Sequence, residues 1–236
     1  MLIVQNVSKK FGNFVALDKL SFNVKNGEIV ALLGKNGAGK STLLKIISGY
    51  MEPDFGDIKF DNINLRQNRI DFLQQLAYVP ENSAIYQDMN VFEFLEFSAG
   101  ARNIYSEQIN RKIKEVCQQI DLTDVMLQKC ETLSKGYKKR VAIAAALMAN
   151  SSVLLLDEPT EGLDPVQKRT LHKILKKLSK NHHIIISTHL MEDVEMVADR
   201  IVLIDKGHLI NNFSLDEFKK MSKTNLMDSF NLAVRG

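Results

Sequence analysis

The sequence predicts an α/β fold with a mostly parallel central sheet, an N-terminal antiparallel β part and an inserted helical lobe. Three largely apolar runs, 28–33, 153–157 and 184–189, are typical of strands buried on both faces of a parallel sheet. A helical pattern over 166–178 joins the last two runs, as a crossover between parallel strands requires. From about 85 to 150 strand signals give way to apolar residues at helical spacing, which predicts the lobe. Core helices of the main sheet are the alternative for that stretch.

Shorter elements flank this core. Strands are expected at 2–7, 14–20 and 21–24, and an Asn-Gly pair at Asn26 and Gly27 favours a hairpin between the last of these and the next strand. A short apolar strand is expected at 76–79. Further hairpins are expected at 57–64 and 200–211, and a helix with acidic residues in its first turn is expected after Ser214.

Length and composition limit the class of protein. The 236 residues fit one large domain, which we place at 1–211, followed by a short, helical tail at 212–236. A net charge of +3 is too mild to indicate nucleic-acid binding. The two cysteines, Cys117 and Cys130, match no metal or redox spacing, so free thiols in a reducing compartment are expected.

Membrane insertion is not expected of this chain. Its first ten residues lack a basic region followed by an apolar stretch, so we expect no signal peptide. No apolar run approaches the roughly 20 residues that span a bilayer. Any work at a membrane would therefore involve another chain.

A phosphate-binding loop is the strongest functional signal. Residues 34–41 read Gly-Lys-Asn-Gly-Ala-Gly-Lys-Ser, between an apolar strand and a helical pattern. The glycines let successive amides turn toward phosphate oxygens, and the helix that follows directs its positive end at the same anion. Lys40 is placed to reach the β and γ phosphates, and Ser41 to hold Mg²⁺. The predicted cradle consists of Gly34, Lys35, Asn36, Gly37, Ala38, Gly39, Lys40, Ser41 and Thr42.

Two consecutive carboxylates complete a nucleotide site. The apolar run 153–157 ends in Asp157, which would lie beside the phosphate loop and hold Mg²⁺ with Ser41. Glu158 follows, where it would polarise water against the γ phosphate. An acidic turn after a strand is the alternative, but the phosphate loop makes that interpretation weak.

The order of these motifs resembles the ATP-binding cassette (ABC) ATPases over residues 2–211. Residues 133–137, Leu-Ser-Lys-Gly-Tyr, resemble the family's signature, and 161–164, Glu-Gly-Leu-Asp, resemble its D-loop. His189 matches the switch histidine, and Phe11 matches the aromatic residue that stacks on adenine. Few other phosphate-loop proteins carry such motifs in this order.

The resemblance implies ATP hydrolysis with Mg²⁺ in a head-to-tail dimer, formed by two copies or with a paired ABC ATPase subunit. Glu158 would be the catalytic carboxylate that orients or deprotonates water, and His189 would contact the γ phosphate. Asp164 would lie between the two sites. The start of the signature helix would be an anion site for the ATP of the opposite subunit. Its residues are Ser134, Lys135 and Gly136.

Two residues depart from the family pattern. Glu81 occupies a position that is usually Gln, which contacts Mg²⁺ or water and couples nucleotide to the transmembrane partner. Lys135 replaces the first glycine of the signature, and we hypothesise that it offsets acidic charge across the dimer interface. The two departures together resemble ATPase subunits of antibiotic-resistance, sodium-extrusion and gliding-motility exporters.

This resemblance implies the energy-coupling subunit of an exporter. It would be peripheral on the cytoplasmic face of the inner or plasma membrane, bound to a separate integral membrane permease through residues 82–90, including Ile85 and Tyr86. No nucleic-acid partner is expected, because the basic run 138–140 belongs to the signature helix. The alternative is a soluble ABC assembly or nucleic-acid-acting complex, although one cassette without coiled coils argues against the nucleic-acid forms. Lys40, Asp157 and Glu158 argue against a degenerate ATPase.

The other histidines and the aromatic residues of the lobe have structural interpretations. His172 is expected on a solvated helix face, and His182 and His183 in a turn. Phe92, Phe94 and Phe97 are expected to pack inside the helical lobe. Residues 226–230 resemble a short terminal helix, or are a frayed end.

Overall fold

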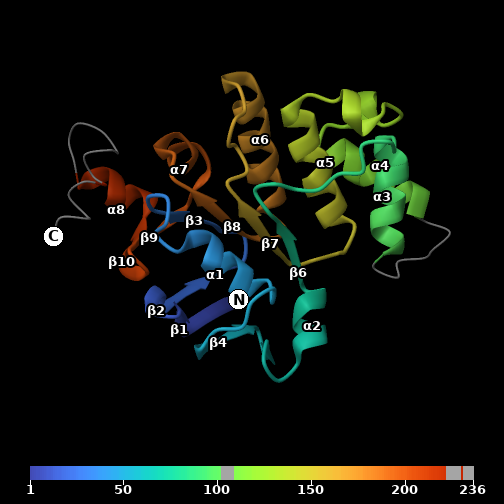
Figure 1. Ribbon diagram of the computed structural model, residues 1–236. Coiled ribbons are helices and arrows are strands. Elements are labelled where there is room, and N and C mark those ends of the chain that lie inside the picture. Colours follow the sequence, from blue (N-terminus) through green and yellow to red (C-terminus); the bar gives the residue numbers. More distant parts are fainter. Residues whose placement is uncertain (102–108, 222–229, 231–236) are drawn as a thin grey trace.

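The computed structural model describes residues 1–101, 109–221 and 230, and it contains two sheets with helices around them (Figure 1). The larger sheet has six strands, which are, from one edge to the other, β10 (His208–Ser214), β9 (Arg200–Asp205), β3 (Ile29–Leu33), β8 (His183–Thr188), β7 (Val153–Asp157) and β6 (Leu76–Val79). The smaller antiparallel sheet has the order β2 (Phe14–Val24), β1 (Leu2–Phe11), β4 (Phe55–Phe60) and β5 (Ile63–Asn64).

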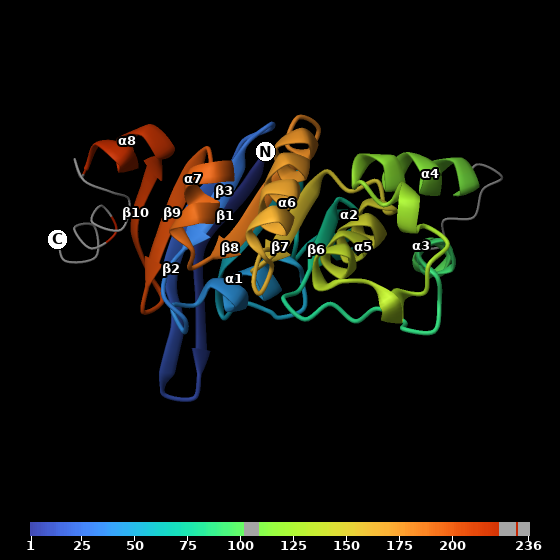
Figure 2. The same ribbon diagram turned by 90° about the horizontal axis from the view of Figure 1, so that it is seen from above.

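The helices fall into groups along the larger sheet. The helices of the lobe lie together at one end of the molecule, and the helix that begins the C-terminal tail lies at the opposite end (Figure 2). The helices are α1 (Lys40–Ile47), α2 (Arg69–Gln74), α3 (Val91–Gly100), α4 (Ile109–Gln119), α5 (Lys135–Leu147), α6 (Pro165–Leu178), α7 (Met191–Val197) and α8 (Leu215–Lys220). Two short 3₁₀ helices, Thr123–Val125 and Cys130–Thr132, join α4 to α5.

The central strand β3 is buried on both faces. Val30 and Leu32 pack into a core that includes α1 and the smaller sheet, whereas Ile29, Ala31 and Leu33 pack into a second core that includes α6, α7 and the helical lobe. Because successive side chains of a strand point to opposite faces, a wholly apolar strand can serve both cores. β3 pairs in parallel with β8 and β9, and β7 with β8 and β6, which confirms the predicted fold class.

The hairpin expected at Asn26 and Gly27 is wrong. β2 pairs instead with β1, and Phe11 lies opposite Phe14. β3 belongs to the larger sheet, and its Ile29 amide donates to the Asp199 carboxylate at 2.8 Å. The physical reason is burial: a strand that is apolar on both faces is more stable between two parallel neighbours than beside β2. The expected hairpins β4–β5 and β9–β10 are present.

Helix α3 of the lobe begins with a capping box between Asn90 and Glu93. Its Val91, Phe94 and Leu95 are buried, as expected, but Phe97 is 46% exposed. At 3.6 residues per turn the buried stripe continues at position 99, so position 97 faces away from it. The expectation that Phe97 packs inside the lobe is therefore wrong.

The tail begins with α8, whose Ser214 and Glu217 form a second capping box. Phe218 on this helix is fully buried. Most of the segment 226–230, for which a terminal helix was an alternative, lies outside the described residues.

Candidate functional site

The loop 34–41 joins β3 to α1 at the carboxyl ends of the parallel strands, where α/β folds bind their ligands (Figure 1). Gly39 has a φ angle of 108°, which only glycine adopts readily. Backbone hydrogen bonds connect the loop to its surroundings: the Gly207 amide donates to the Ala38 carbonyl at 3.0 Å, and the Asp18 amide donates to the Gly207 carbonyl at 2.8 Å. The loop is thus bonded to the turn between β9 and β10, and that turn is itself bonded to β2.

The Lys40 side chain lies inside this loop and is 5% exposed. Its ammonium donates to the carbonyl oxygens of Gly34 at 2.8 Å and Lys35 at 3.2 Å. The same nitrogen is 3.5 Å from Oε1 of Glu158. The structure thus brings the loop lysine and the second predicted carboxylate into one site.

Asp157 ends β7 and is surrounded by hydroxyl donors. The hydroxyls of Ser41 and Ser187 donate to its Oδ1 at 3.0 Å and 2.5 Å, and the Tyr78 hydroxyl donates to Oδ2 at 3.3 Å. Burial is the main cause that raises the pKa of Tyr78 above its usual range, and the nearby Asp157 carboxylate raises it further. The phenol therefore remains a hydrogen-bond donor. A serine hydroxyl and a carboxylate side by side are the oxygen ligands that Mg²⁺ takes, so this pair fits the ion.

Glu158 is held from three directions. Its backbone has a φ angle of 44°, a strained value for a glutamate, and its amide donates to the Ser187 hydroxyl at 2.9 Å. One carboxylate oxygen faces Lys40, and the other is 3.1 Å from Nδ1 of His189. The carboxylate is buried between a cation and an imidazole, where it can accept a proton from water in front of Lys40.

Glu161 joins this group, although the sequence did not single out its side chain. Its Oε2 is 3.8 Å from Nε2 of His189, so the imidazole lies between two carboxylates. One ligand atom each of Glu158, Glu161 and His189 lie within 4.8 Å of one another. The run 161–164 was identified by its resemblance to the D-loop. The contact of Glu161 with His189 was not predicted, because His189 follows β8, a strand far along the chain.

Helix α5 begins at the signature residues. Ser134 is its N-cap and accepts from the Tyr137 amide at 3.4 Å, while Gln167 on α6 donates to the same hydroxyl at 3.3 Å. Asp164 is the N-cap of α6, so the two helix starts lie close together. In the part of the chain that the structure describes, no hydrogen bond joins 134–136 to the loop 34–42.

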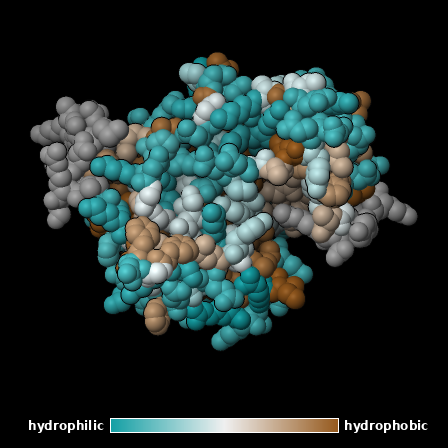
Figure 3. Space-filling model, viewed as in Figure 1, coloured by the Kyte–Doolittle hydropathy of each residue, from teal (hydrophilic) through white to brown (hydrophobic). Residues whose placement is uncertain are grey.

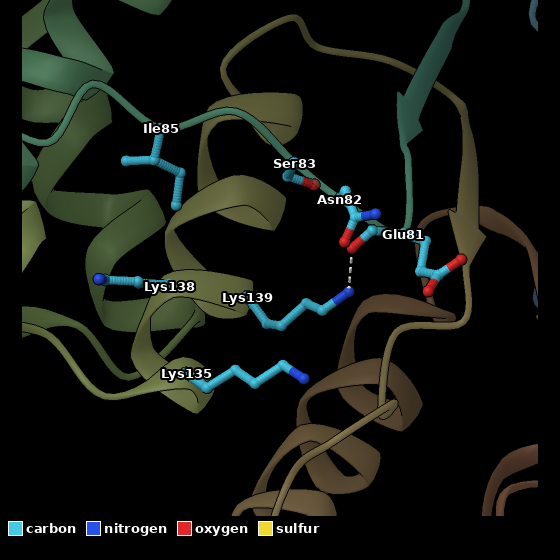
Figure 4. A pocket seen from close by; sticks show the side chains of 7 residues that line it. All are labelled: Glu81, Asn82, Ser83, Ile85, Lys135, Lys138 and Lys139. Carbon is cyan, nitrogen blue, oxygen red and sulfur yellow. Dashed lines mark hydrogen bonds between the residues drawn. The ribbon is translucent and has the colours of Figure 1, made fainter.

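Lys135 and Glu81 lie at the edges of a shallow pocket in front of α5 (Figure 4). The Lys135 side chain extends over Gly162 of its own chain, occupying the space where a side chain at that position would project. Glu81 follows β6, the strand next to β7, and its carboxylate points away from the lysines in Figure 4. No hydrogen bond between Glu81 and Asp157 occurs among residues 1–101 and 109–221.

Phe11 lies near the tip of the β1–β2 hairpin and is 47% exposed. The Lys9 ammonium is 5.9 Å from the centre of its ring. β2 also carries Asp18, which is bonded to the turn that supports the phosphate loop. An exposed ring on this hairpin is available for stacking on a base.

The basic run 138–140 does not form an exposed cationic surface. Lys139 and Arg140 are each 8% exposed. The Arg140 guanidinium lies 4.2 Å from the centre of the Tyr137 ring and donates to the Asp121 carboxylate at 3.0 Å. These lysine and arginine side chains are used within the fold, as the interpretation of a signature helix implies.

The expectation that His172 is solvated is wrong. It is 3% exposed, and its Nε2 is 2.8 Å from Oδ1 of Asp193, which is itself fully buried. The other Asp193 oxygen accepts from the Thr160 hydroxyl at 2.5 Å and from the Thr188 hydroxyl at 2.8 Å. The buried network thus connects the chain after Glu158 with the residue before His189. The periodicity of α6 could not predict the contact between His172 and Asp193, because Asp193 comes from another helix, α7.

His183 also differs from expectation, since it is buried at the start of β8 and not in a turn. Its ring meets Phe60 of the smaller sheet edge to face, with centroids 5.2 Å apart. Burial lowers the pKa of His183, which keeps the imidazole neutral among apolar neighbours.

An aromatic groove opens between the lobe and the end of β6. Tyr86 and Phe97 meet at 5.1 Å between ring centroids, and they remain 55% and 46% exposed. Tyr50 also lines the groove and is 81% exposed. Ala142, Ala145 and Ala146 of α5 form part of its lining. Hydrophobic residues gather where the lobe meets the rest of the molecule (Figure 3). Among the described residues no helix is both long and apolar enough to cross a bilayer.

Sequence comparisons place the chain among transport ATPases. A family model described as ABC transporter matches residues 17–161. The linearmycin resistance ATP-binding protein LnrL of Bacillus subtilis (strain 168) is 35% identical, over 89% of this chain and 68% of LnrL. The SkfA peptide export ATP-binding protein SkfE of the same organism is 33% identical, over 94% and 93%. The sulfate/thiosulfate import ATP-binding protein CysA of Mesostigma viride is 36% identical, over 88% and 60%.

Solved structures agree with this result. The ATP binding subunit of an ABC transporter has a TM-score of 0.86 and 28% identity, over 99% of both chains. A dimeric post-hydrolysis state of the ATP-binding cassette MJ0796, bound to ADP and Pi, has a TM-score of 0.79 and 27% identity, over 91% of this chain and 99% of that one.

Proposed function

The chain belongs to the ABC transporter family as an ATP-binding, ATP-hydrolysing subunit, and on this premise we propose that two cassettes close over two ATP molecules to drive a separate membrane permease. The observation that carries the proposal is the cluster of Lys40, Asp157, Glu158 and His189 at the end of the parallel strands. It combines phosphate binding, metal ligands and a base for water.

In the proposed reaction, water attacks the γ phosphorus of ATP and ADP leaves. Glu158 orients the water and accepts its proton, while His189 holds the carboxylate and contacts the γ phosphate. Lys40 and the amides of the loop 34–42 offset the charge of the phosphate oxygens. Ser41 and Asp157, with Glu81 as a third candidate, would hold Mg²⁺, which supplies further charge neutralisation when bound.

The opposite subunit would complete each site. Ser134 and Gly136 lie at the start of α5 and have no hydrogen bond to their own phosphate loop among the described residues. A helix start offers free amides to an anion, so ATP held by a second cassette is the proposed ligand of this surface. Asp164, at the neighbouring helix start, would lie between the two sites.

The permease would dock in the aromatic groove, and we propose that the protein lies on the cytoplasmic face of a membrane. Large exposed aromatic residues and small alanines at one groove fit a short amphipathic segment of a partner. Export is the proposed direction. It is supported by the similarity to SkfE, a peptide export protein, and to LnrL, a resistance protein, and by the departures at Glu81 and Lys135.

Affinity purification tests the function. A tagged Glu158→Gln protein, purified with ATP from detergent-solubilised native cells, is expected to bring an integral membrane protein in near-equal amount. Recovery of soluble proteins or ribosomes alone would reject the permease proposal and favour a soluble assembly. The sequence of the recovered protein would narrow the substrate.

The groove gives a separate prediction. Phe97→Asp is expected to lower recovery of the membrane partner by about tenfold or more, because a charge would be buried where an aromatic anchor belongs. Phe55→Asp is the matched control, since Phe55 is 71% exposed on β4 of the other sheet. Equal recovery with both variants, at equal thermal stability, would place the partner elsewhere.

A further inference from the structure

The side chain of Lys139 connects the groove to the catalytic carboxylate. It projects from α5 toward the ends of β6 and β7, while Lys138 points the other way (Figure 4). Its ammonium donates to the carbonyl oxygen of Glu81 at 2.5 Å and to that of Glu158 at 3.4 Å. One buried cation therefore contacts the loops that follow two adjacent strands.

This cation is unusual because its acceptors are neutral. Among the described residues Lys139 is 8% exposed and forms no ion pair with a carboxylate. Burial lowers the pKa of Lys139, while Glu81, Asp157 and Glu158 act in the opposite direction. An apolar side chain of the same length would fill this space without a buried charge. What the ammonium adds is its pair of hydrogen bonds to the two loops.

Both carbonyl groups belong to segments that matter for the proposed function. Glu81 begins the segment whose Ser83, Ala84 and Tyr86 line the aromatic groove. The Glu158 peptide is held in a strained conformation, and its position sets where the carboxylate lies. A displacement of the groove segment would therefore reach Glu158 through one side chain.

We propose that Lys139 is a positioning residue that couples occupancy of the groove to the placement of Glu158. This inference rests on the proposed roles of the groove and of Glu158. Because coupling is reciprocal, ATP binding at the cassette would also change the groove segment. Lys139 does not touch the reacting atoms.

Hydrogen exchange tests the coupling directly. In the Glu158→Gln background, which retains the carbonyl oxygen at 158, ATP is expected to slow amide exchange in residues 83–90. Adding Lys139→Met should abolish this response while protection of residues 34–42 by ATP remains. Lys138→Met is the matched control, because it removes the same charge one residue away and its Nζ contacts the Glu131 carbonyl.

Steady-state kinetics give a second readout. Lys139→Met alone is expected to lower kcat by about 10- to 100-fold, since a small misplacement of a catalytic group is costly. The dissociation constant for ATP should stay within about twofold, and Lys139→Arg should restore part of kcat because it keeps the donors. If Lys139→Met does not fold, Lys139→Gln takes its place.

The outcomes separate the two proposals. An unchanged exchange response in 83–90 with Lys139→Met, or a kcat equal to that of Lys138→Met, would overturn the coupling role. Wild-type turnover in Glu158→Gln would instead reject the assignment of the catalytic carboxylate, whatever Lys139 does.

Discussion

Replacing Glu158 by glutamine is expected to lower ATP turnover by about 10²- to 10⁴-fold, the contribution of a general base in similar reactions. The amide keeps the size of the side chain but does not accept a proton from water. Lys40 retains its two carbonyl acceptors in the loop, so phosphate binding should persist. ATP should therefore accumulate bound, and with it the closed dimer.

Phosphate release and size-exclusion chromatography with and without ATP measure both effects. Glu161→Gln is the control, since Glu161 contacts His189 but not Lys40. Its turnover should fall by less than about tenfold, because the base that faces Lys40 is intact. Similar losses in both variants would mean that the two carboxylates share the role.

Replacing Asp193 by alanine is expected to destabilise the fold by about 3–5 kcal/mol, or roughly 6–20 °C in Tm. The carboxylate is fully buried and serves three partners, His172, Thr160 and Thr188. Its removal leaves their polar groups buried without an acceptor. Denaturant unfolding measures the change, and Glu195→Ala, on the exposed face of the same helix, should stay within about 0.5 kcal/mol of wild type.

The loss of stability caused by Asp193→Ala should also depend on pH. Burial acts to raise the pKa of Asp193, but hydrogen bonds from His172, Thr160 and Thr188 together outweigh it and hold that pKa below the ordinary 3.8. A lowered folded-state pKa gives stability that is present above pH 3.8 and is lost as the pH falls through the folded value. The difference in the free energy of unfolding between wild type and Asp193→Ala should therefore become smaller as the pH falls below 3.8 and through the folded-state pKa. A constant gap would mean that the charge of Asp193 contributes nothing.

Local motifs were predictable from the sequence, and contacts between distant elements were not. The phosphate loop is set by the spacing of its glycines, and Asp157 meets Ser41 because strand ends gather at one edge of a parallel sheet. His172 was misplaced because only the packing of α7 brings Asp193 to it. The bridge from Lys139 to Glu81 and Glu158 also requires three elements that no local pattern relates.

Local sequence also failed to predict how the strands after the first antiparallel pair are arranged. Asn26 and Gly27 have the composition of a hairpin turn, yet the strand that follows pairs with β8 and β9. Turn chemistry permits a reversal, but burial decides which strands pair. The roles of individual site residues and the division into a domain and a tail remain predictions of sequence and geometry.

The backbone bonds from Gly207 and Asp18 have a kinetic consequence for nucleotide binding. A loop already fixed by its neighbours loses little conformational entropy when a ligand arrives, because that loss occurred when the chain folded. The association rate of the nucleotide should then be set by diffusion and electrostatic attraction, without a slow step in which the loop closes. Differences among nucleotides should appear mainly in how long each one stays bound.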